Sequence, residues 1–373
     1  MTPELIDTCA KMDELIAQLK DVNIFAVDTE FQRETTYFPH LALVQIATDS
    51  IVACIDPLAF DAKPALQKLL LDKNTTKIFH SCSQDMEVLF YYLGESPTTI
   101  YDTQVANALL TEHHQIGYAA LVEKELGTLL DKSQTRTNWL QRPLTEKQIQ
   151  YAGDDVLYLY QLQHVLDNKL QLLDRKAWFE EDCSKLVDEK NNYQVAIGKL
   201  WKRVKGATRL NRSKLMIVQS IAEWREALAQ QKDKTRRRIL ADEILINLAL
   251  NPPENADKLN KLIGPRYSFS SEEKKTLLEA IDDAMQSSED RWPDNRFDCL
   301  DGEQKSLLKN LQQLVNKKAQ QLEISPSVIC SRKDLEELIL QRKNQHEIQA
   351  SSLNIMHGWR LQCIGQQLLE TLA

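Results

Sequence analysis

The order of apolar runs in the first hundred residues limits the fold more than any other feature of the chain. Three short β-type runs come first, separated by polar turns, at 24–27, 41–47 and 51–55. Two helical stretches then enclose a further short apolar run, at 64–71, 76–79 and 86–93. Three strands followed by helix, strand and helix predict an α/β unit built on a sheet.

The rest of the chain has a helical pattern. Glycine and proline number 10 and 11 of 373 residues, about 6% against about 12% in average proteins, which disfavours an all-β or loop-rich architecture. From residue 144 the helical period continues to about residue 195 with hardly any glycine or proline. We therefore expect the sheet-containing domain over 1–170 and a helical arm or linker over 171–209.

The C-terminal half repeats itself at a shift of 90 residues. Ala229-Gln230-Gln231 recurs as Ala319-Gln320-Gln321, and the apolar positions before it coincide at the same shift. Such a match predicts two copies of one helical module, over 210–288 and 298–373. The stretch 289–297 between them is polar and contains proline, as a linker would.

The net charge of −8 hides a strong asymmetry. Residues 1–190 carry a net −13 and residues 191–373 a net +5, and within the second half 199–238 carries a net +10. That segment is a candidate surface for a polyanion, and the alternative is a solvated helix face or linker. An acidic half that approaches nucleic acid would need metal cations.

The cysteines and the N-terminus bear on where the protein works. The seven cysteines lie far apart without a CxxC pair, so neither a disulfide framework nor a zinc site is indicated. The N-terminus has no basic stretch followed by an apolar run, and no apolar run is long enough to span a membrane. We expect a cytoplasmic protein with no membrane partner.

Candidate catalytic acids follow the predicted strands and begin a predicted helix. Asp28 and Glu30 stand two residues apart after the first strand, so their side chains share one face. Paired carboxylates repel each other unless cations neutralise them, and oxygen ligands suit Mg²⁺ or Mn²⁺. The alternative is an exposed acidic turn. Asp85 lies in the first turn of a helix, which taken alone is ordinary capping.

A phenol and a carboxylate occur together in a later helix. Thr145 and Gln148 have the spacing of a capping box, which predicts that a helix begins there. Tyr151 and Asp155 are four residues apart and share one face of that helix. They can form a proton-handling pair beside a metal, or a half-buried tyrosine and a surface acid. Asp154 lies close to the same face and is not excluded by spacing.

In combination these patterns are far more specific than any one of them. Asp28-Thr29-Glu30-Phe31, His80-(x)4-Asp85 and Tyr151-(x)3-Asp155 resemble the three exonuclease motifs of the DEDD superfamily, in its tyrosine-bearing branch. Asp102-Thr103-Gln104 and the segment 130–145 resemble the ribonuclease D family in particular.

The second half resembles a different domain type. Trp224-Arg225 followed by 239–245 is similar to the first helices of an HRDC domain, and the 90-residue repeat supplies a second copy. Arg236-Arg237-Arg238 follows Asp233 where a proline is often found in that domain, a departure that concerns the surface.

The resemblance implies a fold and an activity. It implies an α/β ribonuclease-H-like exonuclease domain, a mixed sheet flanked by helices, followed by two all-α HRDC domains. It further implies a 3′-to-5′ exoribonuclease that trims RNA 3′ ends, those of tRNA precursors and other small structured RNAs, and releases 5′-mononucleotides. The cofactors implied are two divalent metal ions, Mg²⁺ or Mn²⁺, and the state expected is a monomer.

The resemblance also assigns roles to the five motif residues. Asp28 and Asp155 would hold one metal ion, Asp28 would bridge to a second, and Glu30 and Asp85 would complete the ligand shells. Tyr151 would orient the attacking water. A free phenol has a pKa near 10, so this residue is a positioning group before it is a base.

RNA-binding candidates are the aromatic and basic residues near the motifs and in the basic segment: Phe31, Lys132, Arg142, Arg236, Arg237 and Arg238. The alternatives are core packing for Phe31 and solvation for the basic residues. His80 is expected to be a structural histidine.

Two other functions compete with RNA trimming. One is a 3′-to-5′ exonuclease on DNA, and the other is a non-catalytic scaffold that binds nucleic acid. The complete set of acids disfavours the scaffold, and the segment 130–145 favours RNA over DNA.

Overall fold

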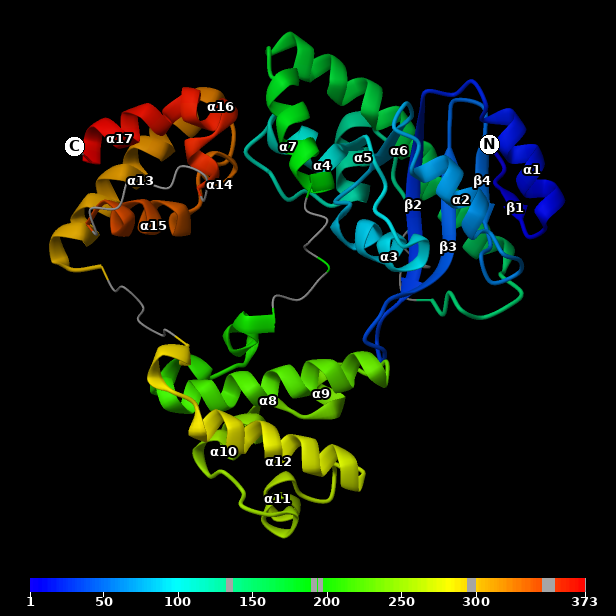
Figure 1. The fold of residues 1–373 in the computed structure, drawn as a ribbon. Coiled ribbons are helices and arrows are strands. Elements are labelled where there is room, and N and C mark those ends of the chain that lie inside the picture. The colour runs from blue at the N-terminus through cyan, green and yellow to red at the C-terminus, as the bar shows by residue number, and fades with distance from the viewer. Residues whose placement is uncertain (132–136, 189–192, 194–196, 294–299, 344–352, 373) are drawn as a thin grey trace. The chain divides into compact units, whose positions relative to one another are not determined.

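The computed structural model describes residues 1–131, 137–188, 193, 197–293, 300–343 and 353–372 (Figure 1). The chain divides into two compact units. The first unit contains residues 1–32, 40–190 and 298–373, and the second contains residues 33–39 and 191–297. Nothing in the described residues forms a helix both long and apolar enough to cross a membrane.

A six-stranded mixed sheet forms the centre of the first unit. Its strands are β1 (Glu4–Ile6), β2 (Ile24–Gln32), β3 (His40–Ala47), β4 (Val52–Ile55), β5 (Thr76–Phe79) and β6 (Ile100–Asp102). They lie in the order β1-β4-β3-β2-β5-β6. β2 pairs antiparallel with β3 and parallel with β5, so it lies inside the sheet. The predicted α/β sheet and its four longer strands are confirmed, and two three-residue edge strands are added.

Helices cover both faces of the sheet. They include α1 (Cys9–Gln18), α2 (Lys63–Leu70), α3 (Ser83–Leu93), α4 (Thr103–Ala108), α5 (Tyr118–Leu126) and α6 (Glu146–Leu172). α3 packs on β2 and β3 from one side, and α6 crosses β2, β3 and β4 on the other (Figure 1). Apolar residues of the strands and of α6 fill the space between them, among them Ala26, Ala47 and Val156.

α6 begins at the predicted capping box. The Thr145 hydroxyl accepts from the Gln148 backbone, and the Gln148 side chain accepts from the Thr145 backbone. A Cβ on Gly153 would lie 2.1 Å from the Pro3 side chain, so glycine lets α6 approach the start of β1. After α6 the chain turns at Asp174, whose φ is 55°, into α7 (Lys176–Asp188).

The C-terminal segment of the first unit packs on α7. It contains α13 (Gly302–Leu322), α14 (Pro326–Ile329), α15 (Arg332–Lys343), α16 (Gly358–Arg360) and α17 (Gln366–Leu372). Arg360 forms two bonds to the Asp182 carboxylate, of 2.5 and 2.9 Å, and the Trp359 ring stacks on Trp178 with centroids 4.5 Å apart. These contacts join the segment to the helices of the sheet domain.

The second unit is helical. Its helices are α8 (Arg212–Gln231), α9 (Arg236–Ile239), α10 (Asp242–Leu250), α11 (Ala256–Ile263) and α12 (Ser271–Gln286). α13, α14 and α15 begin 90 residues after α8, α9 and α10. Asp233 and Glu323, also 90 residues apart, both have left-handed backbones, with φ of 45° and 56°. Three helix starts and one turn therefore recur at the predicted shift of 90 residues.

The connection between β2 and β3 belongs to the helical unit. The backbone N–H groups of Tyr37 and Phe38 each donate to one oxygen of Asp233 at 2.9 Å. The Tyr37 hydroxyl donates to Glu226 and accepts from Gln230 at 3.0 Å. The Tyr37 ring is buried in the core of this unit.

Candidate active site

Two carboxylates come from the central strand. Asp28 and Glu30 lie on one face of β2, opposite Gln45 and Leu43 of β3. After Glu30 the register with β3 shifts, because Phe31 pairs with Leu41. The extra residue on β3 is a β-bulge, a feature that twists and redirects a strand where pairing is interrupted. Both acids therefore stand where the regular part of the β2–β3 ladder ends.

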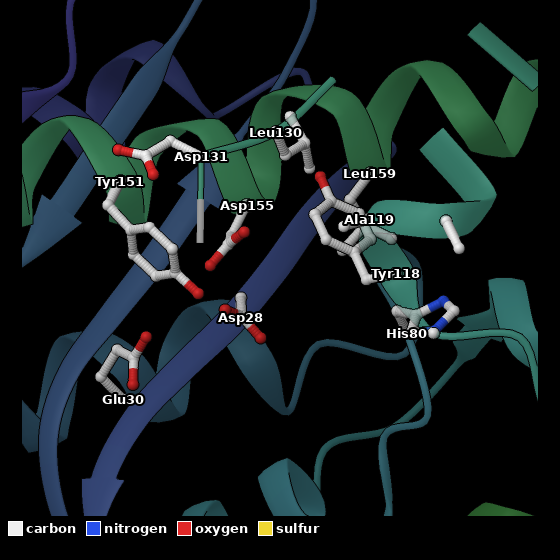
Figure 2. A pocket seen from close by; sticks show the side chains of 12 residues that line it. Asp28, Glu30, His80, Tyr118, Ala119, Leu130, Asp131, Tyr151, Asp155 and Leu159 are labelled. Atoms are coloured by element: carbon white, nitrogen blue, oxygen red, sulfur yellow. The ribbon is translucent and has the colours of Figure 1, made fainter. Parts of the chain in front are cut away.

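The third carboxylate and the phenol come from α6. Oxygen atoms of Asp28, Glu30 and Asp155 all lie within 4.8 Å of one another. The Tyr151 hydroxyl donates a hydrogen bond to Asp155. Figure 2 shows the Tyr151 hydroxyl, Asp155 and Asp28 pointing toward one another, with Glu30 beside them on β2. The spacing argument that placed Tyr151 and Asp155 on one face is confirmed by this convergence.

These side chains line a cavity of about 580 Å³. Its other walls come from His80, from the start of α5 and from the residues before the segment 132–136 (Figure 2). Tyr118 and Leu159 give it an apolar side, and Asp131 adds a further carboxylate. Neither Tyr118 nor Asp131 was among the predicted site residues. Asp131 lies in the segment 130–145, which the sequence marked only by its family resemblance, and no pattern marks Tyr118.

Burial, together with neighbouring negative charges, raises the pKa of each of these carboxylates. Burial, followed by the Asp155 charge, raises the pKa of Asp28 to about 8. Burial and the charges of the neighbouring acids raise the pKa of Glu30 to about 10. Burial raises the pKa of Asp155 to about 7, although the Tyr151 hydrogen bond lowers it. A cation bound among these carboxylates would stabilise their ionised forms.

Asp85 lies on the other side of β2. Thr29 points away from Asp28, and its hydroxyl donates to the Asp85 carboxylate at 2.5 Å. Burial and the Asp28 charge raise the pKa of Asp85 well above its ordinary value. The Asp28 charge therefore acts on Asp85, but Asp85 is not one of the three residues whose oxygen atoms all lie within 4.8 Å of one another.

Asp102 fixes the turn that leads to Asp85. It is buried, and its carboxylate accepts from the backbone N–H groups of Ser81 at 3.1 Å and Cys82 at 2.8 Å. Ser81 has a φ of 59°, a left-handed conformation that needs such support. His80, just before this turn, hydrogen-bonds Thr103 through Nδ1 at 2.9 Å, and burial lowers its pKa.

Arg142 supports the bulge beside Glu30. Its guanidinium donates to both oxygens of Asp56, at 2.6 and 2.8 Å, and to the carbonyl of Ala42, the extra residue of the bulge, at 2.7 Å. Its remaining donors bind the carbonyls of Trp139 and Gln141. All five donors are thus used within the protein, which favours a structural role over the phosphate contact considered from the sequence.

The other RNA-binding candidates have different surroundings. Arg236 forms an ion pair with Glu226 and also donates to the Tyr37 hydroxyl. Arg237 and Arg238 are exposed, and Phe31 is half-buried. Lys132 lies outside the described residues.

The donor set fits divalent cations. Asp28, Glu30 and Asp155 offer carboxylate oxygens, and such all-oxygen sites suit Mg²⁺ or Mn²⁺ more than softer metals. Asp155 lies on the helix α6, and Asp28 and Glu30 lie on the inner strand β2. Because both elements are regular, they hold the ligand side chains within a narrow range of positions.

Comparisons with known proteins agree with this geometry. A family model described as 3′-5′ exonuclease matches residues 3–171, and one described as HRDC domain matches residues 214–281. Ribonuclease D of Shewanella sp. (strain ANA-3) is 34% identical over 98% of this chain and 92% of its own length. Ribonuclease D of Zymomonas mobilis is 32% identical over 99% of this chain and 93% of its own.

A solved structure resembles the whole chain as well. The crystal structure of Escherichia coli RNase D, described as an exoribonuclease involved in structured RNA processing, has a TM-score of 0.87 at 28% identity. The match covers 100% of this chain and 99% of that one. With the acids, the tyrosine and both domain types in the expected order, the chain belongs to the ribonuclease D family of 3′-5′ exoribonucleases.

Proposed function

We propose that this chain hydrolyses RNA from the 3′ end, one nucleotide at a time, and releases 5′-mononucleotides. Asp28, Glu30 and Asp155 would hold two divalent ions, Asp85 would complete a ligand shell directly or through water, and Tyr151 orients the attacking water. The observation that carries the proposal is the meeting of three carboxylates and the Tyr151 hydroxyl in one cavity.

Bound divalent ions would supply water activation and charge neutralisation at the leaving oxygen. The chain provides the rest. Asp28 and Glu30 offer oxygens from a strand whose end is fixed by the bulge, and Asp155 offers another from α6. The Tyr151 hydroxyl donates a hydrogen bond to Asp155, which leaves the lone pairs of its oxygen free to accept from a water and orient it.

Side chains around Tyr151 keep it in place. The Trp139 ring lies 6.1 Å from the Tyr151 ring between centroids, and both belong to an apolar cluster with Leu144 and Ala152. On the opposite wall, Tyr118 and Leu159 offer apolar surface to a terminal nucleoside. The Tyr118 hydroxyl is held by the Asp154 carbonyl at 3.1 Å, so this ring is anchored.

The substrates we propose are the 3′ ends of tRNA precursors and other small structured RNAs, bound by a cytoplasmic monomer. Exposed Arg237 and Arg238 of the second unit would contact phosphates. We also propose that 298–373 is a second HRDC domain, as the 90-residue offset of its helices suggests. The domain limits we propose remain 1–170 for the exonuclease, 171–209 for the arm, 210–288 and 298–373 for the modules, and 289–297 for the linker.

Incubation with 5′-labelled RNA and DNA of equal sequence, with Mg²⁺, Mn²⁺ or EDTA, tests the proposal. We expect a ladder of RNA shortened from the 3′ end with either metal and none in EDTA. Equal shortening of DNA would support the general exonuclease instead. Binding without cleavage in any metal would support a scaffold and contradict the proposal.

A further inference from the structure

A buried glutamine beside the site has no hydrogen bond. Gln45, in β3, has no exposed surface. Neither its side-chain oxygen nor its side-chain nitrogen has a partner among the residues that the structure describes. An unsatisfied buried polar group costs about 1–3 kcal/mol, so such an amide is expected to have a partner in some state of the protein.

The strand register identifies the neighbours of Gln45. It pairs directly with Asp28 on β2 and with Cys54 on β4. Side chains of directly paired residues lie on the same face, with Cβ atoms about 4.5–5.5 Å apart. Gln45 therefore shares a face with the carboxylate that lies at the centre of the acidic cluster.

Cys54 is a poor partner for the amide. Its thiol contacts the Ile149 carbonyl at 3.8 Å, and burial raises its pKa to about 12, so it stays a neutral, weak hydrogen-bonding group. Of the two directly paired neighbours, Asp28 is the one whose side chain can accept strongly from an amide N–H.

Water has no access to Gln45 from outside. α6 crosses β3 on the face that carries Asp28, and Gln45 contributes no surface. The amide therefore lies in the interior between β3 and α6, on the side of the sheet that carries Asp28. A ligating carboxylate commonly receives a hydrogen bond from a neighbouring group, which fixes its orientation.

We propose that Gln45 is a positioning residue, whose side-chain N–H donates to the Asp28 carboxylate when divalent ions are bound. The amide orients the shared ligand from beneath the site and contacts neither metal nor RNA. This inference rests on the proposed metal site, and it adds a residue that no motif indicated.

The test compares Gln45→Met with Gln163→Met in the full chain. Methionine keeps the length of the side chain and removes the amide. Gln163 lies on α6, is also buried, and has an unpartnered side-chain oxygen, so it controls for the loss of a buried amide away from Asp28. The measurements are calorimetric titration with Mn²⁺ alone and thermal unfolding in EDTA.

We expect the Mn²⁺ Kd of Gln45→Met to rise about 10–100-fold while Gln163→Met binds as wild type does. The Tm in EDTA should not fall for Gln45→Met, because the amide has no partner in the metal-free state. Gln45→Leu serves as a second variant with the same expectation.

Two other results overturn the inference and are distinguishable. If wild type binds Mn²⁺ and both Gln45 variants bind it equally well, Gln45 packs the sheet and does not position Asp28. If wild type itself binds no Mn²⁺, the proposed metal site fails, and the role of Gln45 fails with it.

Discussion

Metal-free unfolding reports on the burial of the Asp28 carboxylate and on its repulsion by Asp155. The pKa of Asp28 rises from 3.8 to about 8 in the folded chain. Between these values the folded chain binds more protons than the unfolded one, so the free energy of unfolding falls as pH rises from about 4 to about 8. Asp28→Asn removes this group and should make the metal-free protein more stable at pH 8.

The size of the effect follows from the cost of burying the Asp28 charge and from its repulsion by Asp155, both of which Asp28→Asn removes. A pKa that differs by one between folded and unfolded states is worth about 1.4 kcal/mol. If the substitution removes a penalty equal to one to two pKa units, the free energy of unfolding rises by about 1.5–3 kcal/mol. For a domain of this size that is a Tm increase of about 3–12 °C. At pH 4.5 Asp28 is protonated in the folded wild type but still mostly ionised in the unfolded chain, so the difference should shrink to about 1 kcal/mol.

Differential scanning calorimetry in EDTA at both pH values, and again in saturating Mg²⁺, is the assay. In Mg²⁺ the order should reverse, because wild type gains stability from bound ions and the variant lacks a ligand. Asp49→Asn, an exposed acid in the turn after β3, should leave Tm unchanged. A variant less stable than wild type in EDTA at pH 8 would refute the reasoning.

Three further substitutions test separate parts of the account. Tyr151→Phe should retain Mn²⁺ binding and lose about 100-fold in kcat, measured with saturating RNA. Asp154→Asn is the control and should keep the wild-type rate. An unchanged kcat in Tyr151→Phe would mean that Tyr151 only packs against its neighbours. Replacing Arg237 and Arg238 together by glutamine should make the slope of log K for RNA against log[salt] shallower by about 1.4, at about 0.7 per phosphate contact. The same changes at exposed Lys258 and Lys261 should leave the slope unchanged. Equal slopes in the two double variants would show that Arg237 and Arg238 do not contact phosphates. Tyr37→Phe deletes a hydroxyl that bonds Glu226 and Gln230 and should lower the unfolding free energy of the second unit by about 1–3 kcal/mol; a Tm equal to wild type would argue against that network.

Local patterns predicted much of the fold and the core of the site. The alternation after residue 24 placed Asp28 and Glu30 on one face, and the Thr145–Gln148 box placed Tyr151 and Asp155 on one side of α6. These predictions succeed because period and capping depend on residues a few positions apart. The 90-residue shift also reappears in the starts of three helices, α8 to α10 and α13 to α15, because helix starts depend on nearby residues.

Long-range partners could not be predicted in this way. The bulge at Ala42, its support by Arg142, and the pairing of Gln45 with Asp28 depend on which strands meet. Residues 33–39 joined the helical unit through Asp233, almost 200 residues away, and no pattern in the connection indicates it. β1 and β6 are three residues long, too short for a period to appear.

These contacts also limit how the parts can be tested. Deleting 210–373 would expose Tyr37, which is buried in the second unit, and would remove the partners of Asp182 on α7. Point substitutions on exposed residues therefore separate RNA binding from stability more cleanly than truncation does.

Product analysis in water enriched in ¹⁸O tests the central claim most directly. Wild type, Mg²⁺ and a short RNA are mixed for a single turnover, and the released nucleotide is analysed by mass spectrometry. We expect a nucleoside 5′-monophosphate with one ¹⁸O on its phosphate, and no product from Asp155→Asn. A 3′-phosphate or cyclic phosphate product, or equal turnover by Asp155→Asn, would contradict hydrolysis at this cluster.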